Sequence, residues 1–301
     1  KNVNEDIRNK AYTLNNKIDT HNDSWSQLGQ DLLGDPGDYS GKVSLSADGT
    51  IVAIGAFEHD VGIDNTTNEG RTRIYQYSSN TWSQLGQDLL GDDGDYSGVS
   101  VSLSADGTIV AIGAYFYDVG ADNTTNEGRT RIWKYRTVSQ SEWKSTNIFI
   151  ATAGQTNVGD NDITSGGRRG EAYSSTTKYW IQLGEDLVGD PGDSSGISVS
   201  LSADGTIVAI GDNYHDVDHA NNSNEGRTRI YQYSSNAWSQ LGQDLVGDPA
   251  EHIGRSVSLS ADGTIVAIGA NSYFSDNSNN EGITRIYQYS SNTWSQLGQD
   301  L

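Results

Sequence analysis

The sequence predicts an all-β protein, a β-propeller of four-stranded blades, and three observations support this prediction. The 301 residues include 35 Gly and 3 Pro, and a chain rich in Gly and polar turn residues is typical of many short strands joined by tight turns. A repeat of about 57 residues returns almost verbatim along the chain. Each repeat contains four strand-like segments, which is the content of one propeller blade.

Three short segments define the repeat. Ser-Leu-Ser-Ala-Asp-Gly-Thr-Ile-Val-Ala-Ile-Gly occurs at 44–55, 102–113, 200–211 and 258–269. Trp-Ser-Gln-Leu-Gly-Gln-Asp-Leu occurs at 25–32, 82–89, 238–245 and 294–301, with a variant at 180–187. Thr-Arg-Ile-Tyr-Gln-Tyr occurs at 72–77, 228–233 and 284–289, with a variant at 130–135. A parallel β-helix is the competing architecture, but its coils are shorter than this repeat.

The copy at 99–135 shows how one blade is predicted. Residues 99–104 alternate small polar and apolar side chains, the pattern of a half-buried strand. Ala105-Asp106-Gly107 is a hairpin signal, because Asp-Gly readily adopts the positive φ angles of a tight turn. A β-branched run at 108–114 predicts a strand covered on both faces, and 128–135 a third strand rich in Thr, Ile and aromatic residues. A Trp then opens the fourth strand.

Counting the strands gives five blades and a possible sixth. Six Trp-led strands compare with five central strands, the fifth being the degenerate 148–154. The surplus outer strand could act as a strap that closes the ring, belong to a remnant blade built from 1–31, or pair with a neighbouring molecule. Residues 25–301 are therefore expected to form the propeller.

Residues 1–24 form an extension outside the repeat. Ile7, Ala11, Leu14 and Ile18 have helical spacing, which predicts a short amphipathic docking helix. A pair of poor strands is the alternative.

The charge and residue content restrict the partners. A net charge of −21 disfavours binding to nucleic acid and to anionic lipid. Without Cys the chain has no disulfide and no thiolate metal site. No apolar run reaches the roughly 18 residues that a membrane-spanning helix needs. The absence of Met indicates a processed chain or a fragment, and both fit export to an extracellular, cell-surface or virion-surface location.

The blade at 96–115, followed by Gly-Arg-Thr-Arg-Ile-Trp-Lys-Tyr, resembles the FG-GAP repeat, the family that includes the propeller of integrin α chains. Its "FG" position corresponds to Ser97-Gly98 and Ile253-Gly254. Its "GA" corresponds to Gly55-Ala56, Gly113-Ala114 and Gly269-Ala270, and becomes Gly211-Asp212 in another copy; the Pro is absent from all of them. The variant with a leading Trp-x-Gln-Leu-Gly strand is the most similar.

The resemblance implies calcium in the first hairpin, where many family members carry several carboxylates. Each hairpin here has one, at Asp48, Asp106, Asp204 or Asp262, too few for a calcium cage; these residues are interpreted as turn formers, and no cofactor is expected there. The acidic loops Gly-Asp-Pro-Gly-Asp and Gly-Asp-Asp-Gly-Asp are the remaining calcium candidates: Asp35, Asp38, Asp93, Asp95, Asp190 and Asp193. The Asn-x-Ser/Thr pattern gives four candidate glycosylation sites: Asn22, Asn65, Asn123 and Asn221.

No catalytic residue stands out, because the arginines recur at equivalent places in each repeat and are expected to pair with nearby carboxylates. The sequence therefore predicts a protein that is not an enzyme: an extracellular structural or adhesive propeller, a subunit of a surface filament, coat or virion appendage. It would associate with itself or with other surface proteins or glycans. A glycan-binding or sialidase-like glycan-hydrolysing propeller is the alternative, and non-repeating acids, Arg and Tyr clustered at the central channel would favour it.

Overall fold

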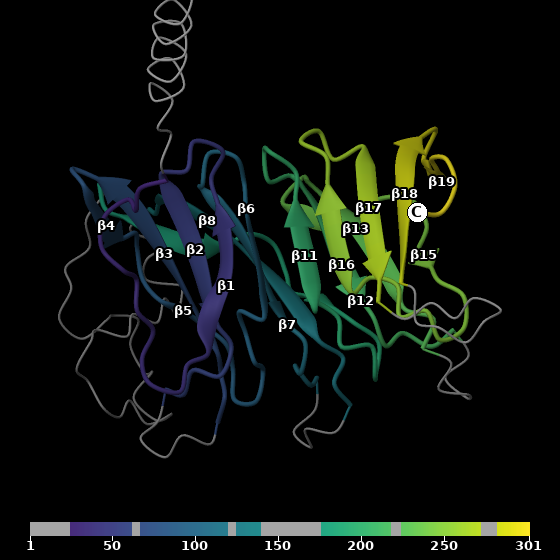
Figure 1. The fold of residues 1–301 in the computed structure, drawn as a ribbon, viewed down its shortest axis with the longest axis horizontal. Helices are drawn as coiled ribbons and strands as arrows, with labels where there is room; N and C mark the ends of the chain where they lie inside the picture. Colours follow the sequence, from purple (N-terminus) through teal and green to yellow (C-terminus); the bar gives the residue numbers. More distant parts are fainter. Residues whose placement is uncertain (1–24, 62–66, 120–124, 140–175, 218–223, 272–281) are drawn as a thin grey trace, which may run out of the picture.

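The computed structural model describes residues 25–61, 67–119, 125–139, 176–217, 224–271 and 282–301, and within them the chain is all-β. Four antiparallel sheets follow one another along the sequence, and each is one blade of a β-propeller. Figure 1 shows the blades side by side in chain order, from purple to yellow. The predicted fold class is confirmed.

Each blade has four strands in chain order, and a two-residue strand from the following loop adds to blades 1, 2 and 3. Blade 1 contains β1 (Ser40–Leu45), β2 (Ile51–Ala56), β3 (Arg71–Ser78) and β4 (Thr81–Gln84), with β5 (Leu89–Leu90) on β3. Blade 2 contains β6 (Ser100–Leu103), β7 (Ile109–Ala114), β8 (Arg129–Thr137) and β9 (Lys178–Gln182), with β10 (Leu187–Val188) on β8. Blade 3 contains β11 (Ser198–Leu201), β12 (Ile207–Asp212), β13 (Arg227–Ser234) and β14 (Ala237–Gln240), with β15 (Leu245–Val246) on β13. Blade 4 contains β16 (Ser256–Leu259), β17 (Ile265–Ala270), β18 (Ile283–Ser290) and β19 (Thr293–Gln296).

The Asp-Gly hairpins form as the sequence predicts. In blade 2, Asp106 accepts hydrogen bonds from the Ser104 hydroxyl at 2.7 Å and from the Thr108 N–H at 2.9 Å. Gly107 has φ of +68°, a conformation in which glycine avoids a steric penalty. The same bonds recur at Asp48, Asp204 and Asp262. These carboxylates hold the turn between the first two strands.

The apolar core lies between blades. One cluster joins Ile51, Ala53 and Ile74 of blade 1 to Val110 and Trp180 of blade 2. Equivalent clusters join blade 2 to blade 3 and blade 3 to blade 4. Because neighbouring blades bury the faces that they turn toward each other, the repeat becomes stable only when blades stack.

The strand that begins near Trp180 pairs with β8 and completes blade 2. The residues between them, which include Trp143 and the predicted fifth central strand at 148–154, fall outside the described part of the chain, as do the predicted helix in 1–24 and the remnant blade there. Trp25 is not in a strand and is fully exposed. Within the described residues, no helix is long and apolar enough to cross a membrane.

Candidate functional site

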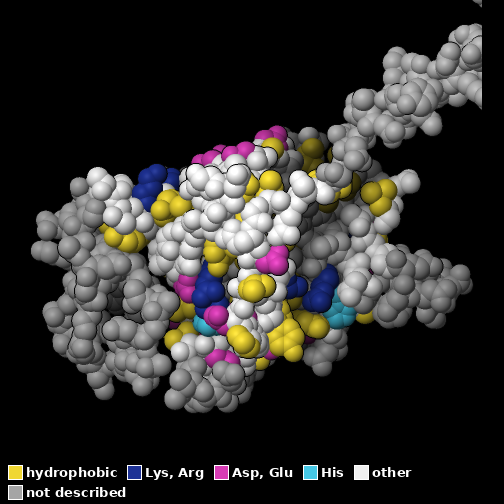
Figure 2. Space-filling model, turned by 60° about the vertical axis from the view of Figure 1, so that its left-hand side comes forward, with side chains coloured by type: hydrophobic (Ala, Val, Ile, Leu, Met, Phe, Trp, Pro, Cys, Tyr) yellow, Lys and Arg dark blue, Asp and Glu magenta, His cyan; other side chains and the backbone are white. Residues whose placement is uncertain are grey.

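An arginine near the start of the third strand lies among carboxylates in every blade, and we call these groups the arginine clamps. In blade 1, Arg71 contacts Asp35 at 2.8 Å and Asp38 at 2.6 Å, both in the loop before the blade, and lies 3.7 Å from Asp88 in the loop after it. Figure 2 shows basic, acidic and histidine side chains next to one another on one face. The other clamps are Arg129 with Asp92, Asp95 and Asp186; Arg227 with Asp190, Asp193, Asp212 and Asp244; and Arg285 with Asp248, Glu251 and Asp300. Arg285 pairs with Ile268 as Arg73 pairs with Ile54, so it occupies the position of Arg73, and Ile283 takes the position of Arg71.

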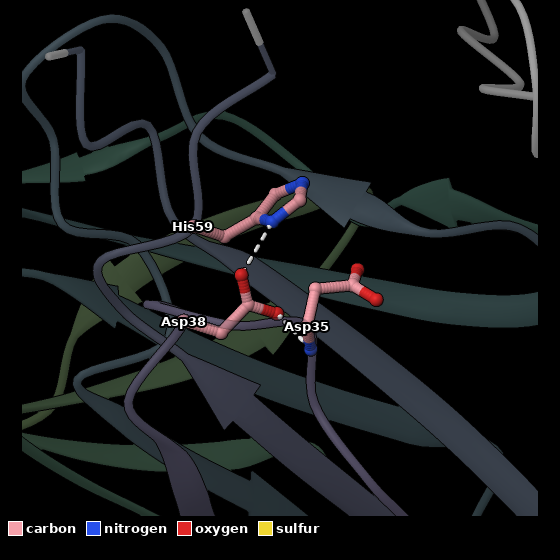
Figure 3. A group of neighbouring side chains, drawn as sticks. All are labelled: Asp35, Asp38 and His59. Carbon is pink, nitrogen blue, oxygen red and sulfur yellow. Dashed lines mark hydrogen bonds and ion pairs between the residues drawn. The ribbon is translucent and has the colours of Figure 1, made fainter. Parts of the chain in front are cut away.

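A histidine joins two of the clamps. His59 Nδ1 lies 2.9 Å from Asp38 Oδ1, and Figure 3 shows the imidazole and this carboxylate facing each other. The second Asp38 oxygen accepts the backbone N–H of Asp35 at 3.1 Å. His215 repeats the contact with Asp193 at 2.9 Å. In blade 2 a tyrosine takes the histidine's place, and the Arg129 guanidinium lies 3.9 Å from the centre of the Tyr117 ring.

The clamps account for the calcium candidates. Asp38, Asp95 and Asp193 are buried and bind the clamp arginines. Asp35 and Asp190 are more exposed and bind the same arginines. In blade 2 this second role belongs to Asp92, which the sequence analysis did not select, rather than to the candidate Asp93. Asp35, Asp38 and His59 have the donor types of a metal site, as do Asp190, Asp193 and His215, but a guanidinium already supplies the positive charge.

The charges within a clamp shift one another's pKa values. The hydrogen bond from Arg71 lowers the pKa of Asp35. Burial raises the pKa of Asp95 to about 6, while the Arg129 guanidinium acts to lower it. Burial also raises the pKa of Asp212, a carboxylate present only in blade 3, against the opposing effect of Arg229 and Arg227. The repetition of the clamps indicates that their main role is structural.

A second group of side chains occupies positions at which most residues differ from blade to blade. These residues follow β2, β7 and β12 or lie just before the first strand of a blade, and we call them the rim: Tyr39, Phe57, Glu58, Tyr96, Tyr115, Phe116, Asn213, Tyr214, His252 and Arg255.

Aromatic contacts hold the rim together at three successive blade positions. Tyr96 lies 6.0 Å from Tyr115 and 5.1 Å from Phe116, ring centre to ring centre. Tyr39 and Phe57 are 6.2 Å apart in blade 1, and Tyr214 and His252 are 5.5 Å apart between blades 3 and 4. Edge-on and tilted pairs at these distances are attractive.

The rim brings side chains of all four blades within electrostatic reach of one hydroxyl group. Burial raises the pKa of Tyr115; Tyr96, Glu58 and Tyr214 act in the same direction, and Arg255 acts against them. Glu58 belongs to blade 1 and Arg255 to blade 4, although 197 residues separate them in the sequence.

One buried rim acceptor has no partner. The Asn213 side chain is 3% exposed, and its Oδ1 accepts no hydrogen bond from any described residue. The Asn213 backbone carbonyl, in contrast, lies 3.1 Å from His252 Nδ1. A buried acceptor without a donor is costly, so a ligand hydroxyl at this place would be stabilising.

The rim residues were not predicted from the sequence, and their signal was the mismatch between otherwise nearly identical repeats. Position 58 in blade 1, for example, is Glu, whereas the equivalent residues are Phe116 and Tyr214. The four candidate glycosylation sites, Asn22, Asn65, Asn123 and Asn221, all lie outside the described residues.

No protein-family model matches the chain, and no curated protein matches it. It is similar to solved structures of two putative 6-phosphogluconolactonases, from Bacteroides uniformis ATCC 8492 (TM-score 0.47, 86% of this chain and 53% of that chain covered) and Bacteroides fragilis NCTC 9343 (TM-score 0.45, 86% and 53%), each at 10% identity. Kuenenia stuttgartiensis hydrazine synthase is similar with a TM-score of 0.42, 10% identity and coverage of 92% and 52%. The chain spans about half the length of these structures.

Two expectations are corrected by these matches. The sequence predicted a non-catalytic structural or adhesive propeller that is not an enzyme. The solved structures that share the architecture are named as enzymes, so a repetitive propeller gives no ground for excluding catalysis. The physical reason is that the repeated residues report on blade packing, whereas a site needs only the few positions in which the blades differ.

Proposed function

We propose that the rim binds a small ring-shaped polyol that carries an anionic group, such as a sugar phosphate or a sugar acid. The observation that carries this proposal is that rim residues of all four blades, most of them at positions where the blades differ, lie within electrostatic reach of the Tyr115 hydroxyl. Positions that repeat are explained by blade packing and by the clamps. The rim residues have no such explanation.

The chemistry of the rim suits such a ligand. The faces of Tyr115 and Tyr214 can pack against the apolar face of a sugar ring. Arg255 is exposed and can bind a phosphate or carboxylate through charge-assisted hydrogen bonds. Asn213 Oδ1 and the Glu58 carboxylate can accept hydrogen bonds from ligand hydroxyls. The overall charge of −21 repels anions at long range, so Arg255 acts at contact distance.

Glu58 also offers a reaction. A carboxylate beside a bound substrate can act as a general base toward water. Hydrolysis of an ester or lactone of the same class of molecule is therefore the reaction that we propose for this site.

Isothermal titration calorimetry with glucose 6-phosphate, glucuronate, glucose and inorganic phosphate tests the binding. The two anionic sugars should bind, and each of the other two more weakly. Arg255→Gln should weaken binding of the anionic sugars about 10-fold or more, as expected for loss of a charged hydrogen bond, and should leave glucose unaffected. Lys134→Gln, a basic residue on β8, is the matched control. Equal binding by wild type and by Tyr115→Ala would refute the proposal.

The reaction needs its own measurement. Glu58→Gln should retain binding of a sugar phosphate and lose hydrolysis of the corresponding lactone. If this variant hydrolyses the lactone as fast as wild type, Glu58 is not the base. The binding proposal is then tested by the titration alone.

A further inference from the structure

The joints between blades are built from the same contacts each time. A serine hydroxyl of one blade accepts the backbone N–H of a leucine in the next blade at 2.9 Å: Ser44 from Leu103, Ser102 from Leu201, and Ser200 from Leu259. The Ala47 N–H donates to the Ala105 carbonyl at 2.9 Å, and the two following joints repeat this bond.

Glycines let the backbones of two neighbouring blades approach each other closely at each joint. A Cβ on Gly55 would collide with the Gly98 carbonyl, and the same holds for Gly113 against Gly196 and Gly211 against Gly254. At the hairpin, Gly107 lies against Ile51, and this contact also recurs in the next two joints. Every blade therefore has an upstream half, the face that it turns to the preceding blade, and a downstream half, the face that it turns to the following blade.

Blade 1 presents an unused upstream half. Leu45 is 58% exposed, whereas its equivalents Leu103 and Leu201 are both 7% exposed. A Cβ on Gly41 or Gly49 would meet no atom within 4 Å. A cleft opens on this side of the blade, lined by Leu32, Leu33, Ser40, Ile54, Arg71 and Tyr75.

Blade 4 presents the matching downstream half. Ile265 is half-buried, whereas Ile51, Ile109 and Ile207 are at most 8% exposed. Gly269, equivalent to Gly55, faces no backbone from another blade. Among the described residues, the Ser258 hydroxyl and the Ala261 N–H lack the bonds that their equivalents make.

We infer that two copies of this chain join head to tail, the downstream half of blade 4 in one copy seating on the upstream half of blade 1 in the other. Ser258 Oγ would accept the Leu45 N–H, the Ala261 N–H would donate to the Ala47 carbonyl, and Gly269 would pack on Gly41. The occupant is a second copy because this repeat supplies every one of these contacts at its own joints. Two such joints close the eight described blades into one ring, within the usual range of about four to eight blades.

One exchange accompanies this joining. The Trp82 indole donates to the Leu28 carbonyl at 2.8 Å, as Trp294 donates to that of Leu241 at 2.7 Å. The segment 25–32 therefore occupies the outer part of the upstream half of blade 1. In the joined pair, the partner's 294–301 would take the same place. The two segments have the same sequence, so one can replace the other with the same contacts.

Sedimentation equilibrium of the full chain tests this inference without any ligand. The expected mass is twice 32.5 kDa. Leu45→Arg and Ser258→Arg each alter one exposed half, so the copy should stay folded by circular dichroism and its dimerisation should weaken about 10-fold or more. Val119→Arg, at a 65% exposed position after β7, is the control and should remain dimeric.

Mixing the two variants identifies the head-to-tail arrangement. The mixture retains one intact joint, between blade 4 of the Leu45→Arg copy and blade 1 of the Ser258→Arg copy, and should form dimers at concentrations at which each variant alone is largely monomeric. A monomeric wild-type chain at tens of micromolar would overturn the inference. So would a dimer unaffected by Leu45→Arg, or variants that fail to complement each other.

Discussion

The indole N–H of Trp180 donates a hydrogen bond to the backbone carbonyl of Leu85 over 2.7 Å, across the boundary between blades 1 and 2. The Gln87 side chain bonds both the N–H and the carbonyl of the same tryptophan, at 3.1 and 2.6 Å. Trp180 is completely buried. The Trp-x-Gln-Leu-Gly-Gln segment is thus a device that joins one blade to the next.

Replacing this tryptophan should be costly. Trp180→Ala removes a buried indole and leaves the Leu85 carbonyl without its donor, so we expect a loss of about 3–5 kcal/mol in the free energy of unfolding. Urea denaturation followed by circular dichroism measures it. Trp25→Ala is the matched control, since Trp25 is fully exposed and should cost under about 0.5 kcal/mol. Equal losses in both variants would contradict the role of the joint.

The clamps predict a contrast within blade 3. Asp193 is buried and binds both Arg227 and His215, so Asp193→Ala should destabilise the chain by about 3 kcal/mol or more, as for a broken buried ion pair. Asp212→Ala should cost less than Asp193→Ala, because the other blades have Ala56, Ala114 and Ala270 at this position and Arg227 keeps three carboxylates, although Arg229 loses its 3.0 Å contact with Asp212. Urea denaturation of both variants measures the two losses in the free energy of unfolding. A larger loss for Asp212→Ala than for Asp193→Ala would contradict this role of the clamp.

The hairpin carboxylates predict a loss of stability in acid. Hydrogen bonds from Ser260 and Thr264 lower the pKa of Asp262 from 3.8 to about 2. A carboxyl whose pKa is lower in the folded state stabilises it above the unfolded pKa, and this contribution disappears as the pH falls from about 4 to about 2. Melting temperatures of wild type and Asp262→Asn should therefore differ above pH 4 and converge near pH 2. A difference that stays constant down to pH 2 would show that the charge of Asp262 is not responsible.

The strands and hairpins could be predicted because their signals are local. The alternation at 99–104 and the Asp106-Gly107 turn depend on neighbouring residues only, and β6 and β7 lie where they were expected. The partner of the Trp180 strand was not predictable, since it pairs with β8 across a long intervening segment. For the clamps, pairing of the arginines with carboxylates was expected, but the choice of Asp92 over its neighbour Asp93 depends on the loop backbone.

The rim could not be predicted for a different reason. Glu58 and Arg255 lie within electrostatic reach of Tyr115 only because the packing of successive blades places residues far apart in the sequence near one another. Comparing the repeats would have shown where the blades differ. It would not have shown that these differences converge.

Under the proposed function, the residues that hold the blades together differ from the rim residues that recognise a ligand, and one measurement tests this separation most directly. A variant combining Glu58→Gln, Tyr115→Ala and Arg255→Gln is compared with wild type by thermal unfolding, with and without glucose 6-phosphate. We expect both proteins to unfold at nearly the same temperature without ligand, and only wild type to be stabilised when ligand is added. A ligand-induced shift that survives in the triple variant would contradict the account.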